Sequence, residues 1–344
     1  MARNSAKRPT IADIAQRAGV SKVAVSYALN GQSGVSEATR KRIIAIAEEI
    51  GFSPSSAARA LTGAAAQAVG LVLSRPARTL GLEPFFMELI SGVEAVLSAR
   101  SYALTLQVVA NPLDEILLYK RWRGERRIDG VLVCDLREDD PRIPALEELT
   151  LPAVVIGGPG HVGRLANIWS DDAAAVVETV EYLHALGHRR IARVGGMPQF
   201  LHTRIRTDAF KETSAKLGLT QATSVASDYS GEDGARVTRR LLSAAQRPTA
   251  IMYDNDVMAI AGLGVVQEMG LSVPGDISIV AWDDSVLCRL VHPPLTALQR
   301  DIPAYGAHAA EILLSIIDGR SAGEVQDPTA QLAPRGSTAP PPRS

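Results

Sequence analysis

Cysteine and aromatic residues are scarce in this sequence. Its 344 residues include two cysteines, and Phe, Trp and Tyr together make up 4%. Cys134 and Cys288 lie far apart in apolar sequence, so we expect buried small side chains there and neither a disulfide nor a metal site. Long apolar runs are also missing, since those around Val69 to Leu73 and Val154 to Ile156 are far shorter than the roughly 20 residues of a membrane-spanning helix. The composition therefore argues against a disulfide-stapled domain and against a transmembrane protein.

The chain as a whole also lacks an excess of charge, with a formal net charge of −1. Residues 1–62 nevertheless carry nine basic and four acidic side chains, whereas the rest of the chain carries 27 and 33. A basic head on an acidic body suits a DNA-binding protein, because Lys and Arg that neutralise phosphates supply most sequence-independent DNA affinity. The same N-terminal segment has no apolar stretch of the kind found in secretory signals, so we expect a cytoplasmic protein.

The segment from Pro9 to Asn30 has the pattern of two short helices joined by a sharp turn. Thr10 and Asp13 form a T-x-x-D capping box, which predicts a first helix over residues 11–18 with apolar residues at spacings of three and four. Gly19 then permits the positive φ with which many helices stop.

Ser21 is expected to cap a second helix over residues 22–29. Its apolar residues Val25, Ala28 and Leu29 face the first helix, which leaves Lys22, Val23, Ser26 and Tyr27 facing outward. We therefore interpret the pair as a helix-turn-helix whose second helix enters the DNA major groove. An ordinary helical hairpin is the alternative, and the basic charge of the segment disfavours it.

A third helix and a short linker follow. The third helix is predicted to begin at Ser36 and to stop at Gly51, with Ile43, Ile44, Ala47 and Ile50 as its apolar stripe. Residues 54–63 are too short and too poor in large apolar groups to form a stable helix alone. We assign residues 1–54 to an all-α head and residues 55–67 to a linker that becomes helical when something supports it.

From Ala68 onward, apolar strands alternate with amphipathic helices, which predicts an α/β domain over residues 68–344. A second series of the same kind starts near Asp172, so we expect two doubly wound parallel-sheet subdomains with a cleft at the carboxyl ends of their strands. The helices are expected at about 84–99, 172–186, 209–217, 234–244 and 255–269, with a short strand near Ser224. The tail beyond Asp318 is expected to be poorly ordered at its end.

With the head, the linker and two α/β halves in this order, the whole chain resembles regulators of the LacI/GalR family. The segments that carry the resemblance are TIADIAQRAGVSKVAVSYALN, VSEATRKRIIAIAEEIGFSPSSAARALTG, GHRRIARVGG, RTDAF, YDNDVMAIAGL, VPGDISIVAWDD, HPPLTALQRD and PRGST. The resemblance implies a helix-turn-helix head on a periplasmic-binding-protein-like core. It also implies a homodimer that binds a pseudo-palindromic double-stranded DNA operator and a small-molecule effector, without a cofactor or a membrane partner.

The resemblance also implies which residues contact DNA. Phosphates are expected at Thr10, Ser21, Asn30, Ser36 and Thr39, base edges at Lys22, Val23 and Tyr27 with Ser26 on the same surface, and hinge contacts at Ser55, Ala58, Arg59 and Leu61. The counterpart of Leu61 wedges into the minor groove and kinks the duplex. Ala24 and Tyr27 depart from the family's usual Thr and Arg, and Tyr cannot make the bidentate guanine contact of Arg. We therefore expect an unusual half-site.

The effector is expected in the cleft, and the resemblance places its contacts at Ser74, Arg75, Phe85, Phe86, Arg206, Asn255, Trp282 and Asp283. Such residues suit a sugar, whose hydroxyls bond polar side chains while its apolar face stacks on an aromatic ring. A nucleobase or another metabolite acting as co-repressor is the alternative effector. Phe85 and Phe86 can instead belong to the core, Asn255 or Asp256 can cap a helix, and Asp172 is expected to cap the helix that it begins.

Two further motifs and two other functions carry less weight. His184 and His188 have the spacing of a metal pair, but Gly187 ends the helix between them, so a structural turn is expected. The glycine-rich residues 157–160 lack the P-loop pattern and are expected to form a loop. A sugar-binding receptor without a DNA function is a rival hypothesis. An enzyme is disfavoured, because the sequence offers no paired nucleophile and base and no metal cluster.

Overall fold

The computed structural model describes residues 9–29, 32–52, 65–75, 81, 83–219 and 221–342. The chain divides into two compact units, Met1–Ala65 and Ala66–Ser344, which are described in turn. None of the helices in these ranges is long and apolar enough to cross a membrane.

The first unit is a three-helix head made of α1 (Ile11–Ala18), α2 (Lys22–Leu29) and α3 (Glu37–Glu49). Ile14, Val25 and Ile43 contribute one fully buried side chain from each helix to its core. The predicted capping box is present, because the Thr10 side chain accepts from the Asp13 N–H and the Asp13 carboxylate accepts from the Thr10 N–H at 2.7 Å. Its predicted stop is present too, with Gly19 at φ +64°.

Arg40 on α3 closes the end of α2. Its guanidinium donates to the carbonyl oxygens of Tyr27, Ala28 and Gln32 at 3.3, 2.9 and 2.6 Å. Carbonyls at the end of a helix lack intrahelical partners and carry partial negative charge, so a cation stabilises them. The predicted stripe of α3 was partly wrong: Ile43 and Ala47 are buried, whereas the Ile44 side chain is 38% exposed.

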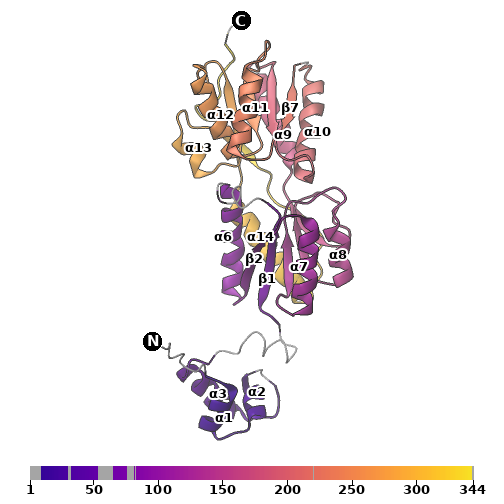
Figure 1. Cartoon of the computed structure of the whole chain (residues 1–344), viewed down its shortest axis with the longest axis vertical. Coiled ribbons are helices and arrows are strands. Elements are labelled where there is room, and N and C mark those ends of the chain that lie inside the picture. Colours follow the sequence, from indigo (N-terminus) through magenta and orange to yellow (C-terminus); the bar gives the residue numbers. More distant parts are fainter. Residues whose placement is uncertain are drawn as a thin grey trace. The chain divides into compact units, whose positions relative to one another are not determined.

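The second unit consists of two lobes, each built around a six-stranded sheet (Figure 1). The first sheet has the order β11-β5-β4-β3-β1-β2 and contains β1 (Ala68–Leu73), β2 (Ala103–Val108), β3 (Gly130–Val133), β4 (Ala153–Ile156), β5 (Ala166–Trp169) and β11 (Glu324–Gln326). The second has the order β12-β10-β9-β8-β6-β7 and contains β6 (Ile191–Gly195), β7 (Thr223–Ala226), β8 (Ala250–Tyr253), β9 (Ser278–Trp282), β10 (Thr296–Gln299) and β12 (Gln331–Ala333). The strands pair in parallel, except that β12 runs antiparallel to β10.

Helices cover both sheets. Those of the first lobe are α6 (Pro84–Ala99), α7 (Pro112–Gly124), α8 (Arg142–Leu149) and α14 (Ile302–Ile317). Those of the second lobe are α9 (Asp172–Ala185), α10 (Leu201–Lys216), α11 (Gly231–Leu242), α12 (Asp256–Glu268) and α13 (Val286–Leu290). The prediction of a two-lobed, doubly wound α/β fold is therefore confirmed, although α10 begins about eight residues earlier than expected.

The chain passes from one lobe to the other three times: between β5 and α9, between β10 and α14, and between β11 and β12. The last two crossings were not predicted. Figure 1 shows α14, in yellow, among the purple elements of the first lobe. The tail, which was expected to be poorly ordered at its end, is described as far as Pro342, and it is well packed at Ser337, which is fully buried and whose hydroxyl donates to the Ile279 carbonyl at 2.6 Å.

Helices α6 and α14 approach so closely that glycine is required at their contact. A Cβ atom added to Gly92 would lie 1.8 Å from the carbonyl oxygen of Pro303, and one added to Gly306 would lie 2.3 Å from that of Leu89. Both obstacles are backbone atoms, which cannot move aside without shifting a helix. This contact fixes α14 on the first lobe.

Gly92→Ala tests this contact. Alanine would stabilise an isolated helix by about 1 kcal/mol over glycine, but the clash with Pro303 reverses the sign. We expect the free energy of unfolding in urea to fall by about 3 kcal/mol, which is typical of overpacking. Ser91→Ala, at the exposed neighbouring position of α6, should change it by less than about 0.5 kcal/mol. Equal stability of the two variants would contradict the packing argument.

Candidate functional site

The outward face of α2 is polar or exposed along its length. Val23 and Tyr27 are 58% and 39% exposed, whereas Val25 and Ala28 are buried against the rest of the head. Lys22 is exposed and Ser26 is half-buried on the outward side. The ring of Tyr27 lies against the backbone turn at Gly34, whose added Cβ would be 3.3 Å from it. The four residues predicted to face outward therefore share one surface.

Three of the predicted phosphate-binding residues begin helices. Thr10 and Ser36 are the N-caps of α1 and α3, and the Ser21 hydroxyl accepts from the Ala24 N–H at 3.1 Å at the start of α2. Thr39, the fourth, lies 2.9 Å from Ser36, hydroxyl to hydroxyl. Helix N-termini attract anions through free N–H groups and the helix dipole, so this arrangement suits phosphate. The predicted contacts Asn30, Ser55, Ala58, Arg59 and Leu61 lie outside the described residues.

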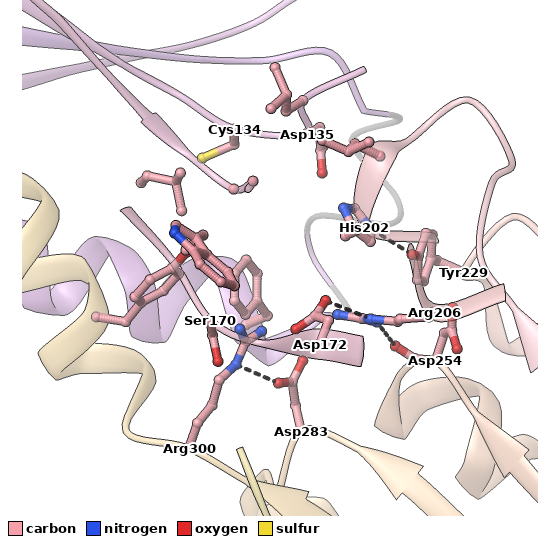
Figure 2. Close-up of a pocket in the computed structure, with 18 of the residues that line it drawn as sticks. Cys134, Asp135, Ser170, Asp172, His202, Arg206, Tyr229, Asp254, Asp283 and Arg300 are labelled. Atoms are coloured by element: carbon pink, nitrogen blue, oxygen red, sulfur yellow. Dashed lines mark hydrogen bonds and ion pairs between the residues drawn. The ribbon is translucent and has the colours of Figure 1, made fainter. Parts of the chain in front are cut away.

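A pocket that is partly open to solvent lies where the strand ends of the two lobes meet (Figure 2). Residues that follow β3, β4 and β5 line it from the first lobe, and residues that follow β8 and β9 line it from the second. Its polar and ionisable lining residues are Arg75, Glu83, Cys134, Asp135, Ser170, Asp172, His202, Arg206, Tyr229, Asp254, Asp283 and Arg300. Burial in such a site removes water from the charged side chains, so each of them needs an oppositely charged or hydrogen-bonding partner.

Three guanidinium groups in the pocket are paired with carboxylates. Arg75 donates two parallel hydrogen bonds to Asp135, both 2.7 Å long, and approaches Glu83 at 3.4 Å. Burial pushes the pKa of Asp135 upward, but the Arg75 guanidinium outweighs it and holds that pKa below its ordinary value. The carboxylate of Asp135 is therefore ionised and fixes the plane of Arg75.

The other two pairs lie beside the second lobe. Arg206 donates to Asp172 at 2.8 Å, and Arg300 donates to Asp283 at 3.1 Å (Figure 2). The Arg206 guanidinium also stacks on Trp282, with its carbon 3.6 Å from the ring centre. A cation over an indole face is held by the ring quadrupole as well as by its carboxylate, so Arg206 is held from two sides.

His202 contributes a neutral imidazole. Burial, assisted by the positive charge of Arg206, lowers the pKa of His202 to about 3. Its Nε2 lies 2.7 Å from the Tyr229 hydroxyl, which lies 2.9 Å from the Thr203 hydroxyl. This chain of neutral groups offers hydrogen bonds to a ligand without adding charge. Aromatic rings of Phe85, Trp169, Tyr229 and Tyr305 complete the lining.

Only some of the predicted effector residues line the pocket. Arg75, Phe85, Arg206 and Asp283 line the pocket. Phe86 belongs to the core of the first lobe, Trp282 lies buried beneath Arg206, and Asn255 is the N-cap of α12. Ser74 is half-buried at the end of β1 and is not part of the described pocket lining. The core and cap alternatives therefore hold for Phe86 and Asn255.

The expectation that Asp172 caps its helix was wrong by one residue. Asp171 is the N-cap of α9 and accepts from the Ala174 N–H, which leaves the Asp172 side chain free to pair with Arg206.

Both cysteines are free and buried, and Cys134 lines the pocket, where burial raises the pKa of its thiol. The His188 ring lies within hydrogen-bond distance of the Thr249 hydroxyl and the Ala339 carbonyl, as a structural role requires.

Sequence reasoning missed Glu83, Asp135, His202, Tyr229 and Arg300. Asp135 directly follows a predicted strand, so its position at the carboxyl edge of the sheet was a usable signal. Arg300 follows β10, a strand that was not predicted. Glu83, His202 and Tyr229 lie outside or at the ends of the predicted elements, and the sequence gives no sign of the partners that they meet across the cleft.

Two family models match the chain. The model described as bacterial regulatory proteins, lacI family, matches residues 10–55, and the periplasmic binding protein-like domain matches residues 180–338. The HTH-type transcriptional regulator CelR of Thermobifida fusca is 30% identical over 93% of this chain and 95% of its own length. The HTH-type transcriptional repressor PurR of Aliivibrio salmonicida (strain LFI1238) is 31% identical over 90% and 92%.

Solved structures of regulators are similar over nearly the whole chain. A complex of the transcriptional regulator CelR with cellobiose is 28% identical, covers 96% of this chain and 100% of that chain, and has a TM-score of 0.72. The Lac repressor dimer bound to operator and the anti-inducer ONPF is 25% identical, covers 97% and 100%, and has a TM-score of 0.85.

Tyr27→Arg is expected to change the preferred DNA site. An arginine can contact guanine with two hydrogen bonds, which is worth about 1–3 kcal/mol of discrimination. Selection from a randomised operator library should therefore gain guanine at one symmetric pair of positions. Tyr27→Phe keeps the ring against Gly34 and loses only the hydroxyl, so it serves as the matched control. If the arginine variant selected the same operator sequence as the wild type, Tyr27 would not be a base-reading residue.

Glu83→Gln is expected to alter the pH dependence of stability. Burial raises the pKa of Glu83 to about 7 despite the opposing effect of Arg75. A raised pKa favours the folded state only while the group is protonated, so the wild type loses stability relative to the variant as pH rises from about 4.5 to 7. The difference should reach about 3 kcal/mol above pH 7.

Unfolding in urea at pH 4.5 to 8 measures this difference. Glu94→Gln, on the helix α6 that Glu83 precedes, should follow the wild-type profile. Parallel curves for the wild type and Glu83→Gln across this range would show that folding does not shift the pKa of Glu83.

Proposed function

This chain belongs to the LacI family of bacterial regulatory proteins, and we propose that it is a homodimeric repressor whose operator affinity is set by a small carbohydrate in the interlobe pocket. It is a ligand-responsive DNA-binding regulator and not an enzyme, as its relatives are transcriptional regulators. We also propose a cytoplasmic location, where its DNA partner would be found.

The pairing of charges in the pocket is the observation that supports a neutral, hydroxyl-rich effector. Arg75, Arg206 and Arg300 each have a carboxylate partner, and Asp254 is paired with Arg193 outside the pocket. An anionic ligand would have to compete with these carboxylates, and a cationic ligand with these guanidinium groups. A sugar hydroxyl can instead accept from a guanidinium and donate to a carboxylate without separating the pair.

The aromatic rings of the pocket support the same assignment. Phe85 and Trp169 come from the first lobe and Tyr229 from the second, so apolar faces are available beside the charged pairs. Carbohydrate sites combine such faces with fixed polar groups. The CelR complex contains cellobiose, a neutral sugar, which agrees with this chemistry. A nucleobase is the alternative, because the same rings could stack on a flat heterocycle.

Exposed apolar side chains support dimerisation. Leu113 and Leu117, four residues apart on α7, are each 65% exposed, and Leu106 and Val108 on the edge strand β2 are 48% and 44% exposed. Exposed apolar groups at helical and strand spacing are typical of a protein interface. The Lac repressor neighbour is a dimer bound to operator. In a dimer, two heads would meet two half-sites, and we propose that residues 55–67 become helical there.

Operator binding at fixed salt tests the proposal. Affinity should be measured for a two-half-site operator and for a single half-site, with cellobiose, glucose, ribose and adenine in turn. We expect at least a tenfold change in affinity for the two-half-site operator with one of the sugars, and no change with adenine. A response to adenine alone would favour the nucleobase alternative, and no response to any sugar would contradict the carbohydrate effector.

Arg206→Lys tests whether the sugar binds in this pocket. Lysine keeps a positive charge near Asp172 but loses the flat guanidinium that stacks on Trp282. The variant should bind operator normally and require at least tenfold more sugar for the same response. Arg240→Lys, an exposed position on α11, is the matched change and should respond like the wild type.

A further inference from the structure

A second cavity, which is open to solvent, lies within the second lobe. It is formed by α10 and by the carboxyl ends of β6 and the edge strand β7. The carboxyl edge of a parallel sheet is where small ligands bind in open α/β folds, because loops and helix starts leave polar groups there. The effector pocket lies at other strand ends, so this cavity is separate.

The charged side chains that line this second cavity are mostly basic. Arg193, Arg204 and Lys211 face one carboxylate, that of Asp208. Arg204 lies 3.8 Å from Asp208 and also pairs with Glu138 of the first lobe. Lys211 is exposed and has no ion pair with any residue of the described ranges. One cation is therefore available to a ligand without breaking a pair.

Arg193 supplies an unused donor. Its side chain is 1% exposed, and its Nε has no hydrogen-bond partner within the described part of the chain. Its Nη1 donates to the hydroxyls of Thr207 and Ser224 at 2.8 and 3.1 Å, and both hydroxyls line the cavity. A buried N–H without a partner is unfavourable, and an oxyanion accepts from such donors. Basic groups with hydroxyls around them are typical of phosphate sites.

The same arginine connects this cavity to the effector pocket. Its Nη2 donates to the carboxylate of Asp254, a residue of the effector pocket. The Asp254 carboxylate is 4.0 Å from the Arg206 guanidinium, and the backbone carbonyl of Asp254 accepts a hydrogen bond from Arg206 at 3.3 Å. Asp254 therefore lies between two guanidinium groups, one in each cavity (Figure 2 shows Arg206 and Asp254).

We propose that the second cavity binds a small oxyanion of the phosphate class and that its occupancy is transmitted to the effector pocket through Arg193 and Asp254. An anion beside Arg193 competes with Asp254 for the guanidinium. Asp254 then pairs more strongly with Arg206, which shifts on Trp282. The proposed anion binding does not depend on the proposed carbohydrate function. Only a change in effector affinity caused by the anion rests on that function.

Titration of inorganic phosphate into the full-length protein tests the site. Calorimetry in a non-phosphate buffer, with sodium chloride replacing phosphate at equal ionic strength, should give saturable binding. Lys211→Gln should raise the dissociation constant at least fivefold, whereas Lys216→Gln, an exposed lysine of α10 outside the cavity, should leave it unchanged. Absence of saturable binding, or an equal loss in both variants, would overturn the proposal.

A second titration with glucose 6-phosphate separates the two sources of such an anion. Tighter binding than inorganic phosphate, with the same dependence on Lys211, would assign the site to a phosphorylated metabolite. Equal or weaker binding with that dependence would assign it to free phosphate. Binding that ignores Lys211 would place the ligand elsewhere and contradict the site.

Trp282 fluorescence tests the connection without any sugar. Phosphate should change the tryptophan emission of the wild type with the same dissociation constant as in calorimetry. Trp282→Phe should bind phosphate but lose most of that change, because the moving Arg206 no longer has an indole beneath it. Phosphate binding with unaltered emission would leave an anion site but overturn its link to the effector pocket. Failure of every sugar to bind would instead affect the proposed function alone.

Discussion

The pairing of buried guanidinium groups with carboxylates is the constraint on which the α/β unit depends. A buried charge without a partner would cost several kcal/mol, so each arginine of the pocket specifies where an acidic residue must lie. Arg75, whose carboxylate partners lie in its own lobe, also links the two lobes, because its guanidinium packs over Phe200 and Tyr229 of the second lobe at 4.9 and 4.7 Å from their ring centres. The shape of the pocket and its chemistry are therefore set by the same contacts.

These pairs also limit what sequence reasoning could provide. The helix caps at Thr10 and Ser36 and the strand runs are local patterns, and they were predicted because their physical causes lie within a few residues. The resemblance to a known family correctly brought Arg206 and Asp283 to the pocket. It could not show that Arg206 pairs with Asp172, because that pair depends on how the successive helices α9 and α10 pack against each other.

Local patterns were also ambiguous where one residue can serve two purposes. Asn255 has the sequence position of both a ligand and a cap, and only the fold shows that its side chain accepts from Met258 and donates to the Tyr229 carbonyl. Ile44 fits the apolar period of its helix, yet it is exposed because two partner helices cover only part of that face. Patterning predicts which faces can be buried, whereas packing decides which of them are.

The return of α14 and β11 to the first lobe has a consequence for the order in which the chain can fold during synthesis. The first lobe begins at Ala68, but the helix that packs on α6 and the edge strand beside β5 are made more than 200 residues later. Domains usually complete folding as they leave the ribosome, N-terminal part first. Here the earlier lobe keeps an uncovered sheet face until the later lobe has been almost wholly translated, so the two lobes must finish together.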